Sequence, residues 1–146
     1  MNNKRTNFSE LLPLIEDSLS QGESITFSPS GQSMLPLLKQ GRDKVVLGPV
    51  KGEIRKYDIV FFKRNDGAFV LHRVVKIGEQ LTVSGDNRIY EDIVAPSQII
   101  GVVTSFERKG KEYVGKEMIS GPYLAFVFFR RLLRKVINRI RSIGRN

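Results

Sequence analysis

Residues Asp58–Ile77, "DIVFFKRNDGAFVLHRVVKI", predict a β-hairpin and with it the fold class. Two runs rich in Val, Ile and Phe flank the sequence Asn65-Asp66-Gly67. β-branched and aromatic residues favour strands, and Asp-Gly between two apolar runs is a strong signal for a hairpin turn. We therefore expect two antiparallel strands, over residues 58–64 and 68–77.

Short apolar runs on both sides of this hairpin predict that the rest of the chain is also mostly β. In residues 23–30, "ESITFSPS", alternation places Ile25 and Phe27 on one face of a strand. Residues 86–98 are expected to form a loop. Such closely spaced strands favour a mainly β fold, a compact, coiled, antiparallel sheet. The other expected strands are residues 43–50, 79–85, 99–108 and 111–114.

Two helices are expected, one before and one after the residues that are expected to form the sheet. Residues 8–20 predict a short amphipathic helix. In residues 122–146, apolar residues recur at helical spacing and basic residues fill much of the other face, which is typical of a cationic amphipathic helix. We therefore divide the chain into a domain over 1–121, with its core in 24–114, and a basic helix over 122–146. The apolar face of the first helix comprises Phe8, Leu11, Leu12, Ile15 and Leu19.

The charge of the chain is concentrated in its last segment. The 146 residues carry a net charge of +9, and seven of the 24 basic residues but none of the 15 acidic residues lie in 122–146. This asymmetry favours an anionic partner, either a membrane surface or a nucleic acid. The seven residues are Arg130, Arg131, Arg134, Lys135, Arg139, Arg141 and Arg145.

The composition excludes several classes of protein. The chain has no cysteine and a single histidine, so disulfides, thiol nucleophiles and zinc sites are not expected. No nucleotide-binding motif is present, and no cofactor or metal is expected. Neither a signal peptide nor a transmembrane run is visible. We expect a protein of the cytoplasm, or one that is peripheral at the inner face of the membrane.

Ser33 and His72 are candidate catalytic residues. Ser33 lies between Gly31, which allows a tight bend, and Pro36, which stiffens the exit from the loop. It is either an ordinary turn serine or a nucleophile whose neighbouring amides stabilise an oxyanion. His72 is either a half-buried sheet residue or the base that a serine needs at neutral pH.

The third candidate element is the acidic segment 84–92, "SGDNRIYED". It contains Asp86, Glu91 and Asp92. Gly-Asp-Asn is a common turn sequence, so these acids are either turn residues or the source of a carboxylate that orients the imidazole. Spacing alone does not distinguish the two.

Together these segments resemble the signal peptidase I superfamily, which includes the self-cleaving repressors of the SOS response. The resemblance covers residues 24–107 and depends on several motifs occurring in order. One of them, "KYDIVFF", has Tyr57 where the family has glycine. The others are "SGQSMLP" (30–36), "VLHRVV" (70–75), "GDNRIYED" (85–92) and "IIGVV" (99–103).

The resemblance implies a role for each candidate. Ser33 would be the nucleophile, and its own amide would form part of the oxyanion hole. His72 would be the base, at a position where bacterial signal peptidases have lysine and the archaeal and endoplasmic-reticulum enzymes have histidine. Asp92 would orient His72, with Asp86 as the second candidate. Gly31 replaces the serine that often assists the oxyanion in signal peptidases.

The leading hypothesis is a serine endopeptidase that cleaves a peptide, leader or precursor protein with a Ser-His-Asp triad. We expect no membrane anchor before Ser33 and no helix-turn-helix before residue 24, so export signal cleavage and DNA-binding repression are not expected. The alternative is a non-catalytic or weakly active peptide-binding module of the same fold, associated with an anionic membrane surface through 122–146.

Nucleic-acid binding by the segment 122–146 is less favoured, because Phe126, Phe128 and Phe129 precede the arginines rather than alternating with them. For the segment itself, packing of its apolar stripe on the body or on a partner is an equal alternative to membrane contact.

Overall fold

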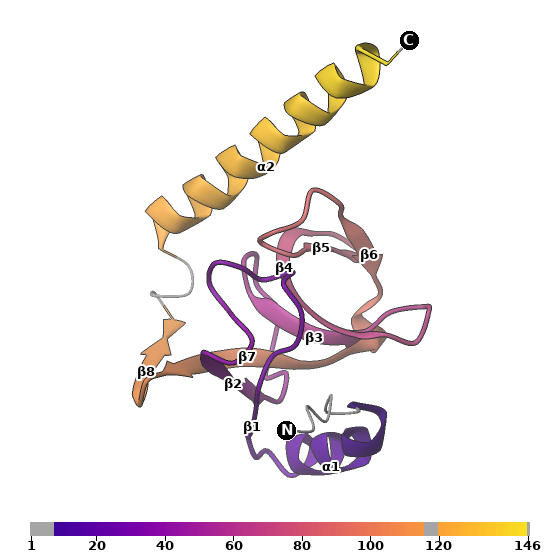
Figure 1. Cartoon of the computed structure of the whole chain (residues 1–146). Coiled ribbons are helices and arrows are strands. Elements are labelled where there is room, and N and C mark those ends of the chain that lie inside the picture. The colour runs from indigo at the N-terminus through magenta and orange to yellow at the C-terminus, as the bar shows by residue number, and fades with distance from the viewer. Residues whose placement is uncertain (1–7, 116–119, 146) are drawn as a thin grey trace.

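The computed structural model describes residues 8–115 and 120–145 of the chain (Figure 1). In Figure 1, one helix lies below a strongly coiled sheet and the other lies above it. The elements are α1 (Phe8–Ser20), β1 (Ile25–Phe27), β2 (Asp43–Gly48), β3 (Ile59–Lys63), β4 (Phe69–Ile77), β5 (Leu81–Ser84), β6 (Asp92–Val94), a short 3₁₀ turn (Pro96–Gln98), β7 (Ile99–Arg108), β8 (Lys111–Val114) and α2 (Gly121–Ile143).

The strands form one antiparallel sheet, so the mainly β prediction is confirmed. Within the described residues the order is β1-β2-β7-β3-β4-β5-β6, and β8 pairs with β7. The expected hairpin is β3–β4, with Phe62 opposite Val70 and Val60 opposite His72. The long strand β7 pairs with β2 and β3, strands that are far from it in sequence.

One strand was not expected from the sequence. β6 lies inside the segment that we interpreted as a loop over 86–98, and it pairs with β5 with Asp92 opposite Val83. It has three residues, of which Asp92 is half-buried, Ile93 exposed and Val94 buried. Such a short segment shows too few alternations to stand out as a strand.

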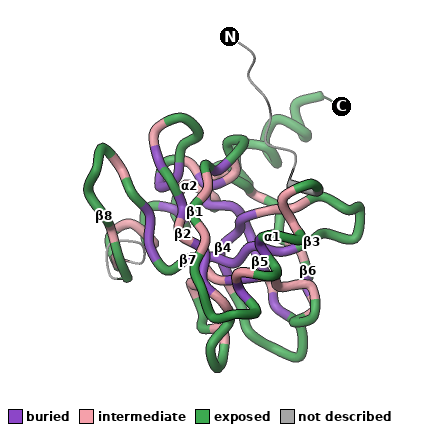
Figure 2. Tube along the Cα trace, turned by 90° about the horizontal axis from the view of Figure 1, so that it is seen from below, coloured by how far each residue is buried: buried purple, intermediate pink, exposed green. Residues whose placement is uncertain are grey.

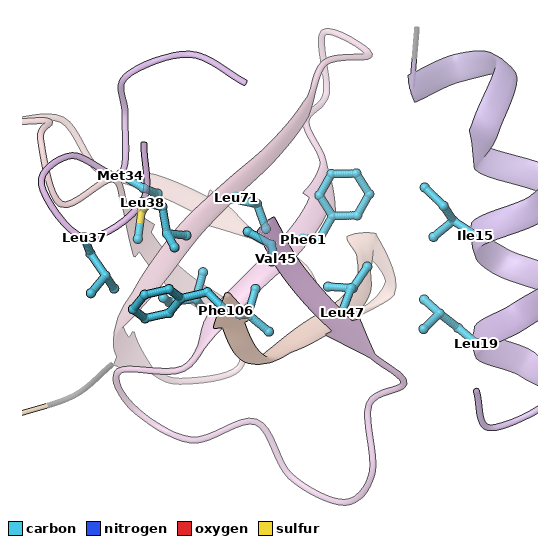
Figure 3. Close-up of a cluster of buried hydrophobic side chains, with 12 residues drawn as sticks. Ile15, Leu19, Met34, Leu37, Leu38, Val45, Leu47, Phe61, Leu71 and Phe106 are labelled. Atoms are coloured by element: carbon cyan, nitrogen blue, oxygen red, sulfur yellow. The ribbon is translucent and has the colours of Figure 1, made fainter. Parts of the chain in front are cut away.

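Both faces of the hairpin are covered, because the sheet coils upon itself. One cluster joins Phe61 and Leu71 to buried residues of α1 and of the segment 34–38, as Figure 3 shows. The other joins Val60, Phe62 and Val74 to β5 and β6. Figure 2 shows that the buried trace runs through the strands at the centre, whereas much of α2 is exposed. The two clusters enclose β3 and β4 and thereby fix the strand that carries His72.

The helix α1 occurs over the residues expected. Ile15 and Leu19 are buried and Leu11 packs against them, as the amphipathic pattern predicted. Phe8 lies outside the side chains that the structure describes. Neither helix in the described part of the chain has the length and hydrophobicity to span a bilayer.

Candidate active site

Ser33 lies on a loop that leaves β1 and returns to β2. Gly31 has φ of +77°, so it makes the tight bend that the sequence predicted. Directly after Ser33, the side chain of Met34 is buried in the core together with Leu37 and Leu38. The loop is therefore fixed by its apolar side chains, and Ser33 itself remains partly exposed.

The exit of this loop is tied to the sheet by a buried carboxylate. Asp43 accepts hydrogen bonds from the amide of Lys39 and from the guanidinium groups of Arg42 and Arg108. Arg108 also donates to the carbonyl of Leu37 at 2.7 Å. Burial raises the pKa of Asp43, but the hydrogen bonds from Arg108 and Arg42 outweigh it and hold that pKa below its usual value.

The turn after β5 supports the Ser33 loop through backbone contacts. The amide of Asn87 donates to the carbonyl of Ser33 at 2.9 Å, and its side-chain amide donates to the carbonyl of Gln32 at 3.0 Å. A Cβ on Gly85 would lie 2.5 Å from the Ser33 carbonyl oxygen. Glycine is therefore required at position 85 for this close approach.

His72 is buried in β4, with only 6% of its surface exposed. Its ring meets that of Phe62 edge-on, with 5.8 Å between centroids. Nδ1 lies 3.8 Å from Oδ2 of Asp92 and has no hydrogen-bond partner among the described residues. This distance is a few tenths of an ångström too long for a hydrogen bond, and Asp92 is the acid toward which Nδ1 would donate.

Burial controls the protonation of this imidazole. It lowers the pKa of His72 to about 4, although the Asp92 carboxylate opposes the shift; Arg88 and Arg64 lower the pKa further. His72 is therefore neutral at neutral pH. A neutral imidazole is the form that accepts a proton from a serine hydroxyl.

Asp92 is placed by β6 and by a contact that closes the preceding loop. The hydroxyl of Ser84 donates to the carbonyl of Tyr90 at 2.7 Å, which joins the two ends of the loop 85–91. The side chain of Asp92 is 43% exposed. It therefore borders the site from a third segment of chain, after the Ser33 loop and β4.

Ser33, His72 and Asp92 line one pocket of about 470 Å³. Its apolar lining includes Phe27, Phe61 and Leu71, and Arg64 and Arg88 also line it. A hydroxyl, a neutral imidazole and a carboxylate that open on one pocket make up the side chains that acyl transfer by a serine requires. In the described residues, no group of three or more His, Asp or Glu side chains is arranged to hold a metal ion.

Asp86 does not line this pocket. Its two carboxylate oxygens accept hydrogen bonds from Nε and Nη2 of Arg73 at 2.8 and 2.9 Å, and Oδ2 also accepts from the hydroxyl of Tyr123 at 2.8 Å. Both Arg73 and Asp86 are at most 1% exposed. Of the three acids considered from the sequence, Asp92 lines the pocket and Asp86 and Glu91 do not, so the geometry favours Asp92 as the partner of His72.

Several residues that support the site were not singled out from the sequence. Arg73 donates to the carbonyl of Tyr57, whose φ of +77° lies in the left-handed region that favours glycine. Arg130 of α2 donates to the carbonyls of Leu35 and Asp86 at 3.1 and 2.6 Å. For the contact between Arg73 and Tyr57, the available sequence signal was the tyrosine at a position where the family has glycine. Nothing in the sequence indicated the contacts of Arg130.

The pocket on the coiled β-sheet thus brings together a serine, a histidine and an aspartate. The Peptidase S24-like family model matches residues 3–104 of the chain. That range includes Ser33, His72 and Asp92. The chain therefore belongs to the Peptidase S24-like family, and the broader part of the sequence prediction, a relation to the signal peptidase and SOS-repressor superfamily, is supported. A search of curated proteins found no match.

Proposed function

We propose that the chain is a serine endopeptidase of the Ser-His-Asp type. The observation that carries the proposal is the convergence of Ser33, His72 and Asp92, from three separate segments, on one pocket. Membership of the Peptidase S24-like family supports peptide chemistry. The assignment to the histidine branch, which resembles the archaeal and endoplasmic-reticulum signal peptidases, rests on His72 alone.

In the proposed reaction, Ser33 Oγ attacks the carbonyl carbon of a peptide bond while His72 takes the hydroxyl proton through Nε2. Asp92 holds the imidazole through Nδ1 and stabilises its protonated form. The proton then passes from His72 to the leaving amine. Water, activated by His72, hydrolyses the acyl-enzyme and restores Ser33. The amide of Ser33 contributes to the oxyanion hole.

The pocket suits an extended peptide. Residues Phe69–His72 of β4 pair with β3 on one side, whereas β5 pairs with β4 only from Arg73 onward, within the part of the chain that the structure describes. This half of β4 therefore presents a sheet edge along the pocket wall. A substrate segment would dock there as an added strand, with its scissile bond between Ser33 and His72.

The test is labelling by a fluorophosphonate, which reacts with activated serines. Wild-type protein should be labelled, and Ser33→Ala and His72→Ala should abolish labelling because each removes a group that the reaction needs. Ser30→Ala is the matched control, since Ser30 lines the same pocket and should leave labelling unchanged. Folded wild-type protein that fails to react would instead favour the alternative, a peptide-binding module without catalysis.

A further inference from the structure

The helix α2 presents opposite faces to the body and to solvent. Tyr123, Val127, Arg130 and Arg134 recur every three or four residues, and all four contact or pack on the body. Arg131 adds hydrogen bonds to the carbonyls of Arg88 and Gly85. Most contacts of this face with the body are hydrogen bonds from side chains to backbone carbonyls. The arginines of α2, rather than its apolar residues, therefore set the orientation of the helix.

Five exposed apolar residues of α2 lie on a face away from these contacts, whereas Val127 packs on the body. We call them the outer stripe: Phe129, Leu133, Val136, Ile140 and Ile143, spaced by four and three residues as one helical face requires. Their exposed fractions are 65%, 48%, 47%, 63% and 69%. Contiguous exposed apolar surface of this kind marks a binding surface. Figure 1 shows the C-terminal half of the helix extending away from the strands.

The charges around the outer stripe indicate its partner. Lys135 and Arg139 are exposed and border the stripe on the helix surface, and no acidic residue occurs in α2. A second copy of the helix would bring cations against cations, which is unfavourable. Of the basic residues, Arg130, Arg131 and Arg134 are bonded to the body, which leaves fewer for nucleic-acid phosphates. An apolar stripe bordered by cations matches the boundary between acyl chains and anionic headgroups.

We propose that α2 docks the protein on an anionic lipid bilayer, with the outer stripe in the acyl-chain boundary and Lys135 and Arg139 at the headgroups. Packing of the apolar stripe on the body, the other expectation from the sequence, does not occur in this structure. Because α2 is bonded to residues 85–88 and to Leu35, docking also holds the pocket at a fixed position above the membrane. The inference does not depend on peptidase activity.

The test uses the full chain with Ser33→Ala, which cannot cleave itself, in flotation with vesicles of phosphatidylcholine alone or mixed with phosphatidylglycerol. The protein should float with the anionic vesicles and less so at high salt. A triple variant of the outer stripe, Phe129→Ser, Leu133→Ser and Ile140→Ser, should weaken the partition by about 100-fold or more. Lys135→Gln with Arg139→Gln should weaken it by about 30-fold on anionic vesicles only.

The matched control removes exposed apolar side chains from the body. Leu14, Val50 and Ile77 are 56%, 40% and 47% exposed, and the triple variant Leu14→Ser, Val50→Ser, Ile77→Ser should float as the parent does. The chain has no tryptophan, so Leu133→Trp gives a direct readout of insertion. Its fluorescence should shift to the blue on anionic vesicles, whereas that of Ile77→Trp should not.

Four outcomes would overturn the proposal. The first is a parent protein that does not float with anionic vesicles, and the second is an equal loss of flotation in the two triple variants. The third is a dimer that the outer-stripe variant converts to monomer, without any vesicle binding. The fourth is DNA binding with a steep salt slope in place of vesicle binding. A blue shift confined to Leu133→Trp supports the proposal even if a multiple variant proves unstable. Because every arm uses an inactive protein, failure here leaves the peptidase proposal untouched, and failure of labelling leaves this one untouched.

Discussion

Asp86 and Asp92 are carboxylates close in sequence that lie in different surroundings. Asp86 is enclosed with Arg73 and Tyr123, and both of its oxygens are occupied. Asp92 is partly exposed and borders a buried imidazole nitrogen that has no hydrogen-bond partner in the described residues. A buried polar atom without a partner costs free energy, so a small movement of Asp92 toward His72 would be favourable when substrate closes the pocket. We therefore propose that Asp86 has a structural role and that Asp92 orients His72.

This assignment predicts that the two acids separate activity from stability. Asp92→Asn should reduce the labelling rate by roughly 10³-fold, because an orienting carboxylate stabilises the protonated imidazole. It should change the free energy of unfolding by about 1 kcal/mol or less, since the side chain is 43% exposed. Asp86→Asn leaves Arg73 with its charge buried and unpaired, which should cost about 3 kcal/mol or more. Urea unfolding and labelling kinetics on the same preparations measure both quantities.

The control for the Asp86 pair is the double variant Arg73→Met with Asp86→Asn. Removing both charges should restore part of the stability that Asp86→Asn loses, because no unpaired charge remains in the core. The assignment fails if Asp86→Asn is as stable as wild type but loses as much labelling as Asp92→Asn. Equal losses of activity from two folded variants would mean that both carboxylates act on His72.

At the scale of elements, the position of α2 against the site depends on contacts to backbone carbonyls. Arg130 donates to the carbonyl of Leu35, two residues after Ser33, and to the carbonyl of Asp86. The hydroxyl of Tyr123 donates to the Asp86 carboxylate; burial and that carboxylate raise the pKa of Tyr123 well above its usual value, so it remains a neutral donor. The helix thus joins the two loops that form the pocket, although it lies outside the pocket itself.

We therefore expect Arg130→Ala to affect a site that it does not touch. Loss of its two hydrogen bonds should destabilise the protein by about 2 kcal/mol, since hydrogen bonds from charged groups are stronger than neutral ones. Labelling should slow as the Ser33 loop loosens. Lys135→Ala on the same helix is the matched control, because Lys135 is exposed, and it should change neither quantity. Conservative Arg130→Lys should restore part of the labelling; if Arg130→Ala labels at the wild-type rate, the helix is not a support for the site.

The sequence was sufficient to predict those elements whose structure is determined by a local pattern of residues. The Asp-Gly hairpin, the α1 helix and the α2 helix all occur as expected, because their apolar periods are long and their turn residues are specific. β6 was missed because three residues carry no period. The orientation of α2 was not predictable either. Helical spacing identifies the apolar face of α2. It does not indicate that arginines bind the carbonyls of residues 85–88, because the sequence does not show which backbone carbonyls will accept hydrogen bonds.

The whole molecule contains a single histidine, and the shift in its pKa makes stability depend on pH between 6.5 and about 4. His72 is buried, and its pKa falls from 6.5 to about 4 in the folded protein. In the unfolded chain the same imidazole titrates at its ordinary value. At a pH between these two pKa values, His72 is protonated in the unfolded state and neutral in the folded state. Stability therefore rises with pH across this window.

The predicted consequence is a loss of about 3 kcal/mol in the free energy of unfolding as the pH falls from 6.5 to about 4, which is the shift converted at 1.4 kcal/mol per unit. Asp43 and Asp66 contribute mainly below this window, because their pKa values are lowered from 3.8 in the folded protein and their stabilising effect is lost as the pH falls through and below that value. Urea midpoints across this range measure the slope, and the lone imidazole C–H signal in NMR gives the folded pKa directly. His72→Gln is the control, since glutamine has no proton to gain and should flatten the slope. A wild-type imidazole that titrates near 6.5, or a slope unchanged in His72→Gln, would mean that His72 is hydrated and not held as the neutral base.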